Sequence, residues 1–172
     1  SSRPAPTYPP QSGEAFEGTG AFPSGVGSGD PTDSSVLLWT RVHPDRDAGG
    51  GVAVLVDVAT APTFDPRSTM GTFRAHATAA TDHCVTIDAT GLDPGTIYWY
   101  RFRYHDEVSR VGRTRTAPAP GERSGRVRLA AFSCQRWTHG WYTAHADLAA
   151  LAAHPETDID LVICLGDYVY NT

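Results

Sequence analysis

Lysine is absent from this sequence: all 14 basic residues among its 172 are arginine, against 19 aspartate and glutamate residues. The formal net charge is -5, and no basic stripe stands out along the chain that could follow the phosphates of a nucleic acid. Uninterrupted apolar runs are also short, well under the roughly 20 residues that a membrane-spanning helix needs. We therefore expect no nucleic-acid partner and no transmembrane segment, which leaves peripheral membrane contact open.

Cysteine is scarce, with only Cys84, Cys134 and Cys164. Three thiols cannot all pair within one chain, so at least one must be free, bound to a metal, or bridged to another chain. An oxidising compartment is neither required nor excluded. Residues 1–20, rich in Pro, Ser and Gly, are predicted to be a tail. That tail is either what signal-peptide removal leaves or an ordinary disordered terminus.

Residues 21–117 have the pattern of an all-β domain. Short runs of alternating or β-branched residues predict strands at 36–42, 53–59, 73–78, 84–87, 97–104 and 109–114. Turn signals separate these runs, and the stretch from Gly91 to Phe102 resembles a corner and strand of fibronectin type III domains. Alternation there places Tyr98, Tyr100 and Phe102 on one face. The sequence predicts an Ig/fibronectin III-like sandwich.

Residues 118–125 are a Pro- and Gly-containing linker, after which the pattern changes. We predict a strand at 127–132, a helix at 142–154 and an apolar strand at 160–165, which together make one βαβ unit with parallel strands. Two strands cannot form a stable domain alone, because both faces of the sheet need to be covered. Residues 126–172 are therefore expected to be the start of a second, incomplete domain.

Three side chains suited to metal binding follow the two strands of that unit. Cys134 comes just after the first strand, and Asp167 and Tyr170 come after the second. In open α/β sheets, sites form at the carboxyl ends of strands, and neighbouring strands lie about 4.8 Å apart. Each residue also has a simpler interpretation: a turn for Asp167, a packed ring for Tyr170 and a buried thiol for Cys134. Together they favour a metal site.

Other candidates are weaker. Cys134 could act as a nucleophile with His139 or His145, but no orienting third residue is evident. The glycine-rich run at 25–30 lacks the following lysine and helix of a phosphate loop. Asp30 and Asp33 could bind calcium, although solvated turn carboxylates explain them better. Arg136, Trp137 and His139 follow Cys134 directly and are predicted to line a substrate pocket. No catalytic acid or base is assigned.

Several motifs in order resemble the PhoD-like alkaline phosphatases and phosphodiesterases. They are FPSGVGSGDP at 22–31, LWTR at 38–41, YRF at 100–102, GRTRT at 112–116, FSCQ at 132–135 and LGDYVY at 165–170. The resemblance covers nearly all of the chain after the tail. Secreted actinobacterial members include a metal-dependent phospholipase D, and this sequence looks similar to that branch. The resemblance thus implies a secreted, extracellular protein.

The resemblance further implies a calcineurin-like metallophosphoesterase domain after the sandwich. In that domain Cys134 and Tyr170 would bind ferric iron, and Asp167 would bridge iron (Fe3+) and calcium (Ca2+). It implies hydrolysis of phospholipid head-group phosphodiesters, or else a broader phosphomonoesterase and phosphodiesterase activity. The remaining ligands of such a site are not in this chain, so we expect a C-terminal fragment of the same enzyme to supply them as a second chain. A β-sandwich binding module without catalysis is the alternative of another class.

Overall fold

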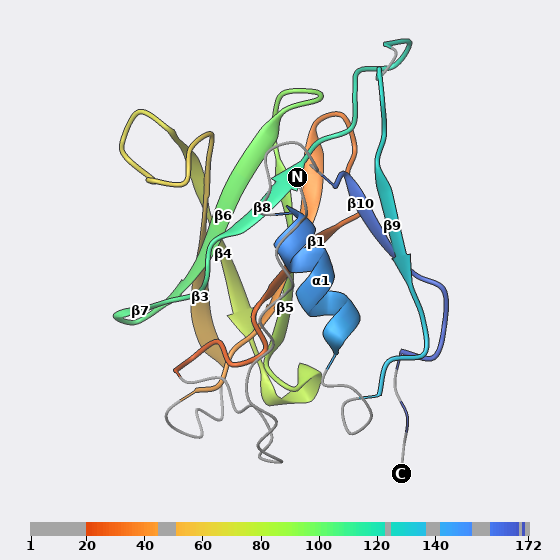
Figure 1. The fold of residues 1–172 in the computed structure, drawn as a ribbon. Coiled ribbons are helices and arrows are strands. Elements are labelled where there is room, and N and C mark those ends of the chain that lie inside the picture. The colour runs from red at the N-terminus through yellow and green to blue at the C-terminus, as the bar shows by residue number, and fades with distance from the viewer. Residues whose placement is uncertain are drawn as a thin grey trace. The chain divides into compact units, whose positions relative to one another are not determined.

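The computed structural model describes residues 20–44, 51–122, 125–136, 142–152, 159–168 and 170. The chain folds into two compact units, one formed by Phe16–Arg123 and the other containing Ser124–Thr172 (Figure 1). Predicted strands at 53–59 and 97–104 and the predicted strands of the second unit are all present, with ends that differ by a few residues. In the described residues, no helix is both long and apolar enough to cross a membrane.

The first unit consists of two antiparallel sheets. One sheet has the order β1–β2–β5, from β1 (Val26–Gly29), β2 (Ser35–Arg41) and β5 (Cys84–Thr90). The other has the order β4–β3–β6, from β4 (Thr69–Ala77), β3 (Val52–Ala59) and β6 (Ile97–Tyr104). Two short strands, β7 (Glu107–Val108) and β8 (Gly112–Arg115), both pair with β6. A 3-10 turn, η1 (Ala79–Thr81), leads into β5.

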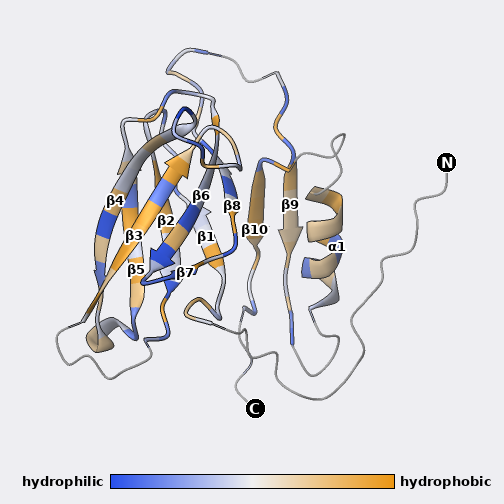
Figure 2. Cartoon of the chain, turned by 90° about the vertical axis from the view of Figure 1, so that its left-hand side faces the viewer, coloured by the Kyte–Doolittle hydropathy of each residue, from blue (hydrophilic) through white to orange (hydrophobic). Residues whose placement is uncertain are grey.

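Alternation along the strands builds the core between the sheets. Tyr98, Tyr100 and Phe102 on β6 are buried, as the sequence pattern predicts, while the residues between them are partly exposed. The same alternation on β2 and β3 buries Leu38 and Val56. Figure 2 shows it as changing colours along β3 and β6. The buried side chains form one hydrophobic cluster, which is the main source of stability of the unit.

The corner before β6 is held by a buried hydroxyl. Tyr98 Oη accepts a hydrogen bond of 2.8 Å from the backbone N–H of Asp93. Gly95 adopts a φ of 60°, which a residue with a side chain rarely tolerates. A tyrosine bonded back to the chain just upstream is the corner device of immunoglobulin-type sandwiches.

One predicted strand is wrong, and one strand was not predicted. Residues 109–114 do not form one strand: Ser109 Oγ accepts from Phe102 N at 2.8 Å, and this side-chain bond interrupts the ladder between β7 and β8. The run at 25–30 contains β1, which the sequence pattern did not predict because glycine is a poor strand former. Pairing with β2 stabilises this segment as a strand despite its low strand propensity. Thr40 Oγ1 also donates a hydrogen bond of 2.7 Å to Gly25 O.

The second unit contains β9 (Leu129–Phe132), α1 (Thr143–Ala152) and β10 (Leu161–Cys164) in that order. β9 and β10 are parallel, with Leu161 opposite Leu129 and Cys164 opposite Phe132. All four residues of β10 are exposed. Cys164 is therefore exposed, although an apolar strand of this kind is typical of a buried sheet, because nothing in the described part of this unit covers β10. Cys84 is half-buried, and all three thiols are free.

Candidate metal centre

The two parallel strands of the second unit continue to pair beyond their ends. Leu165 N donates to Phe132 O at 2.8 Å, and Cys134 N donates to Gly166 O at 3.3 Å. The chain then turns sharply on both sides: Cys134 and Asp167 have φ values of 56° and 51°, and Gly166 has a φ of 136°. Only glycine adopts that last value readily. These turns bring the side chains that follow β9 and β10 together at the carboxyl ends of the two strands.

Cys134 and Tyr170 both contact one carboxylate oxygen of Asp167. Cys134 Sγ lies 3.2 Å from Asp167 Oδ2, and Tyr170 Oη donates to the same Oδ2 at 2.9 Å. The three side chains thus follow two different strands, and Cys134 and Asp167 are 33 residues apart in sequence. All three residues are exposed, so the group is open to solvent and to ligands. The sequence-predicted metal ligands are therefore neighbours in space.

Hydrogen bonds among these three side chains determine the protonation states of the Asp167 carboxyl group and the Tyr170 phenol. The thiol of Cys134 and then the phenol of Tyr170 hydrogen-bond to Asp167 and lower the pKa of its carboxyl group. Conversely, the hydrogen bonds of Tyr170 to Cys134 and to Asp167 raise the pKa of the phenol. In the absence of a cation, the carboxylate is thus ionised and the phenol keeps its proton. A cation bound here would take the place of the protons, because thiol and phenol bind metals as thiolate and phenolate.

The spacing and chemistry of these atoms fit a metal ion. Ligands at about 2.0–2.3 Å from a metal lie roughly 3 Å from one another, which is the separation found between these atoms. Sulfur suits transition metals and excludes calcium, which takes oxygen ligands, whereas a carboxylate accepts either ion. Within the described part of the chain, no group of three or more His, Cys, Asp or Glu side chains could hold a metal. Cys134, Asp167 and Tyr170 therefore form a partial ligand set.

A cavity of about 360 Å³ opens beside the three side chains. It is lined by Ser133, Cys134, Gln135, Arg136, Tyr142, Thr143, Ala144 and Tyr170. Its size is at the lower end of that of small-molecule sites. Arg136, a sequence-predicted pocket residue, is in this lining and brings a guanidinium suited to a phosphoryl oxygen. Trp137 and His139, the other two, lie outside the described residues.

The geometry gives less support to the two alternatives, a Cys134 nucleophile and a phosphate loop at 25–30. His145 packs its ring edge-on against Phe132, with centroids 4.4 Å apart, while the thiol of Cys134 is engaged with Asp167. His139, the other possible partner of a Cys134 nucleophile, is outside the described residues. The glycine-rich run contains β1 and is followed by a turn into β2 and not by a helix, so the arrangement of a phosphate loop is missing.

Sequence reasoning did not single out Tyr142 and Gln135, which also line the cavity. Tyr142 directly precedes α1 and has a φ of 55°, an uncommon value for a residue with a side chain. Gln135 Oε1 is buried without a hydrogen-bond partner in the described part of the chain. The position of Gln135 next to Cys134 could have indicated its role, whereas nothing in the sequence relates Tyr142 to the strand ends.

Comparisons with known proteins bear on both units. Residues 8–118 match the N-terminal domain of the PhoD-like phosphatases, and residues 129–172 match the PhoD-like phosphatase domain. The chain is 42% identical over 155 residues to alkaline phosphatase D of Bacillus subtilis, which covers 87% of the chain and 25% of that protein.

A solved structure of PhoD superposes with a TM-score of 0.73 at 40% identity, over 85% of the chain and 27% of that structure. The fn3 domain of human collagen alpha-1(XX) is far less similar, with a TM-score of 0.37 at 17% identity over 59% of the chain and 86% of that domain. The chain spans about a quarter of the length of the two PhoD relatives. Taken together, the PhoD matches show that the chain belongs to the PhoD-like phosphatase family.

Proposed function

We propose that this chain is the N-terminal part of a metal-dependent phosphoesterase that cleaves phosphodiesters of phospholipid head groups. The observation that carries the proposal is the convergence of Cys134, Asp167 and Tyr170 at the carboxyl ends of two parallel strands. These residues lie in the segment that matches the PhoD-like phosphatase domain. An incidental turn would not need a thiol, a carboxylate and a phenol around one oxygen atom.

Within this proposal, Cys134 and Tyr170 would hold ferric iron, and Asp167 would be a ligand to both iron and calcium. A bound metal pair supplies positive charge that orients a phosphoryl group, offsets its developing negative charge and activates a water molecule. Thiolate and phenolate side chains of this chain stabilise the trivalent ion. Arg136, in the cavity beside them, would bind and orient a phosphoryl oxygen, because a guanidinium presents paired donors.

We propose that the active enzyme also uses residues from outside this chain. The described residues contribute a partial ligand set, and the chain spans about a quarter of its relatives. All four residues of β10 and two of the four on β9 are exposed, and Figure 2 shows both strands as almost uniformly hydrophobic. We propose that a C-terminal fragment of the same enzyme, present as a second chain, covers these strands and completes the site. An extracellular location belongs to this proposal.

A second candidate activity is broader hydrolysis of phosphomonoesters and phosphodiesters at alkaline pH. It is favoured by the name of the relative, alkaline phosphatase D, at 42% identity. Hydrolysis of phosphatidylcholine compared with that of a nitrophenyl phosphomonoester separates the two candidates. We expect the phospholipid to be cleaved with the higher kcat/KM, and a preference for the monoester would favour the second candidate.

Metal content tests the site itself. The purified protein, together with any chain that co-purifies with it, should contain iron in stoichiometric amount and lose activity when chelators remove its metals. Cys134→Ala should lower both the iron content and the activity, whereas Cys84→Ala, in the sandwich, should lower neither. Fully active protein without iron would contradict the assignment. A binding module without catalysis would show neither metal nor activity.

A further inference from the structure

The outer face of the larger sheet of the sandwich collects arginine side chains from three strands. These are Arg74 on β4, Arg101 and Arg103 on β6, and Arg113 and Arg115 on β8. The register places them opposite the core, because the alternate residues Phe73, Phe102 and Thr114 point inward. In the sequence these arginines are spread over more than 40 residues, and only the pairing of the strands brings them onto one surface.

This arginine face has the opposite sign of charge to the chain as a whole. At the outward positions of β3, β4, β6, β7 and β8, the acidic residue is Asp57, which leaves a net charge of +4 on the face. The chain overall has a net charge of -5. Asp57 is only 5% exposed and accepts hydrogen bonds from Arg101 and Arg103, so it presents little negative charge to solvent. The face is therefore suited to a partner that carries several negative charges.

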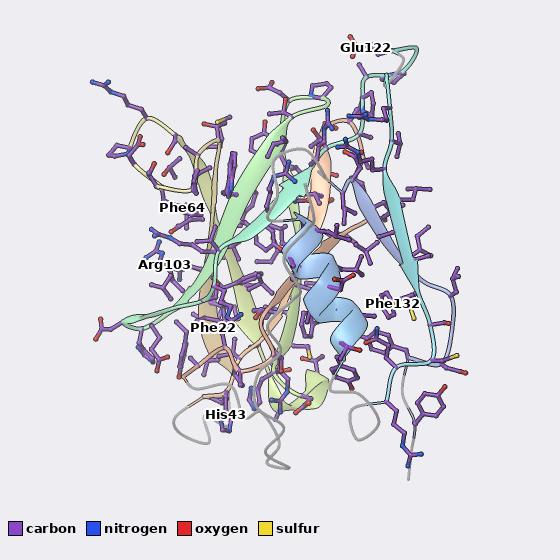
Figure 3. The ribbon with its side chains drawn as sticks, viewed as in Figure 1. Phe22, His43, Phe64, Arg103, Glu122 and Phe132 are labelled. Carbon is purple, nitrogen blue, oxygen red and sulfur yellow. The ribbon has the colours of Figure 1, made fainter. Side chains whose placement is uncertain are left out.

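Two of the guanidinium groups are held in place by their neighbours. Arg103 binds Asp57 through two bonds of 2.8 and 2.9 Å. Arg101 donates to Asp57 at 3.1 Å, and its guanidinium lies 4.3 Å from the centre of the Phe64 ring. Figure 3 labels Phe64 and Arg103 on this side of the sheet. Side chains that are already ordered lose less entropy when they bind a ligand.

Exposed apolar side chains accompany the arginines. Met70 on β4 is 49% exposed, and Val108 on β7 is 51% exposed. Val108 pairs directly with Arg103 and Met70 alternates with the inward Gly71, so both lie on the arginine face. With Val111, at 47%, they are the exposed large hydrophobic residues of the described sandwich. A soluble polyanion would engage the arginines alone, whereas a lipid surface offers phosphates to the arginines and an apolar layer to Met70 and Val108.

We propose that the arginine face docks the protein onto an anionic phospholipid bilayer. Arginines bind the lipid phosphates, and Met70 and Val108 enter the boundary between head groups and acyl chains. Binding of this kind is peripheral and weakens with salt. The proposal goes beyond hydrolysis at the metal centre, and vesicle binding can succeed or fail whether or not a phosphoester is cleaved.

Sedimentation with vesicles tests the proposal. The purified protein should bind vesicles of phosphatidylglycerol mixed with phosphatidylcholine and should not bind vesicles of phosphatidylcholine alone. Arg74→Gln and Arg113→Gln should each weaken binding about fivefold, because an arginine near an anionic surface contributes about 1 kcal/mol. Arg41→Gln is the matched control, since Arg41 lies on β2 in the other sheet, where it pairs with Asp82. It removes the same charge and should change binding less than twofold.

A separate variant, Met70→Ser, tests the apolar contribution to vesicle binding. Met70→Ser should weaken the binding that remains at high salt, without changing the melting temperature. The proposal is overturned if the protein does not bind anionic vesicles, or if Arg41→Gln weakens binding as much as Arg74→Gln. It is also overturned if a soluble oligonucleotide displaces the vesicles completely and Met70→Ser has no effect. That last result would assign the face to a soluble polyanion.

Discussion

Asp57 is the buried charge on which the larger sheet of the sandwich depends. It accepts hydrogen bonds from Arg101 and Arg103 on β6 and from Thr72 on β4, so it links three neighbouring strands. Burial raises the pKa of its carboxyl group, but the hydrogen bonds from Arg103, Thr72 and Arg101 outweigh burial and lower the pKa below its usual value. The ionised form of Asp57 is therefore the stable one in the fold.

Removing this charge should destabilise the protein. Asp57→Asn keeps the shape of the side chain but leaves two arginines without their anion, and we expect a loss of about 2 kcal/mol in the free energy of unfolding. Asp82→Asn is the matched control, because Asp82 binds Arg41 at the surface with its side chain 74% exposed. Exposed pairs contribute at most about 1 kcal/mol. Urea denaturation of both variants measures the difference, and equal losses would contradict this role.

The lowered pKa of Asp57 also predicts a dependence on pH. Since the pKa is lower in the folded than in the unfolded state, Asp57 contributes its full stability above the unfolded value of about 3.9. This contribution is lost as the pH falls through the folded pKa. The difference in unfolding free energy between wild type and Asp57→Asn should thus shrink below about pH 4. A difference that stayed constant down to the acid transition would contradict this sign.

At the scale of elements, β8 depends on the absence of a side chain at Gly112. A Cβ atom there would stand 2.6 Å from Cε1 and Oη of Tyr100, whose ring is buried and packs edge-on against Phe102. Gly112→Ala should therefore cost about 2 kcal/mol, because the ring cannot move without disturbing the core. Gly29→Ala on β1 is the control, since nothing lies within 4 Å of its Cβ position. Thermal melting distinguishes them, and equal melting temperatures would refute this packing.

The regular elements were accessible from the sequence because their signal is local. Alternation along β6 predicts both its ends and its buried face, and the apolar run of β10 predicts a strand. The failures have non-local causes. Glycine-rich β1 is a strand only because β2 lies beside it, and the break at Ser109 depends on a side-chain bond to Phe102 across the sheet. Pairing partners of this kind cannot be read from a single segment.

The candidate site residues also divide into those that a local sequence signal predicts and those that depend on contacts distant in sequence. Cys134, Asp167 and Tyr170 could be predicted because the ends of neighbouring parallel strands must meet at one edge. Tyr142 could not, because its place in the cavity depends on how the chain enters α1. The arginine face was missed for a similar reason: its members are dispersed in the sequence and assemble only through the register of β4, β6 and β8.

At the scale of the whole molecule, we expect another polypeptide to cover the exposed strands of the second unit. Leu129 on β9 is 60% exposed and Leu161 on β10 is 47% exposed, although buried parallel strands have this composition. Backbone amides of β9 and β10 should exchange hydrogen much faster in the isolated chain than those of β3 and β6. Adding the C-terminal polypeptide of the enzyme should slow the exchange of β9 and β10 selectively. Protection of all four strands to the same extent in the isolated chain would contradict this view.

The central claim is that Tyr170, with Asp167 and Cys134, binds a metal ion. The visible spectrum of the iron-loaded protein, together with any chain that co-purifies with it, tests this claim most directly, because phenolate bound to ferric iron absorbs visible light by charge transfer. We predict that Tyr170→Phe shifts or abolishes the band. Tyr168→Phe, which removes a neighbouring exposed phenol, should leave it unchanged. A band that is unaltered in Tyr170→Phe at full iron content would contradict the claim.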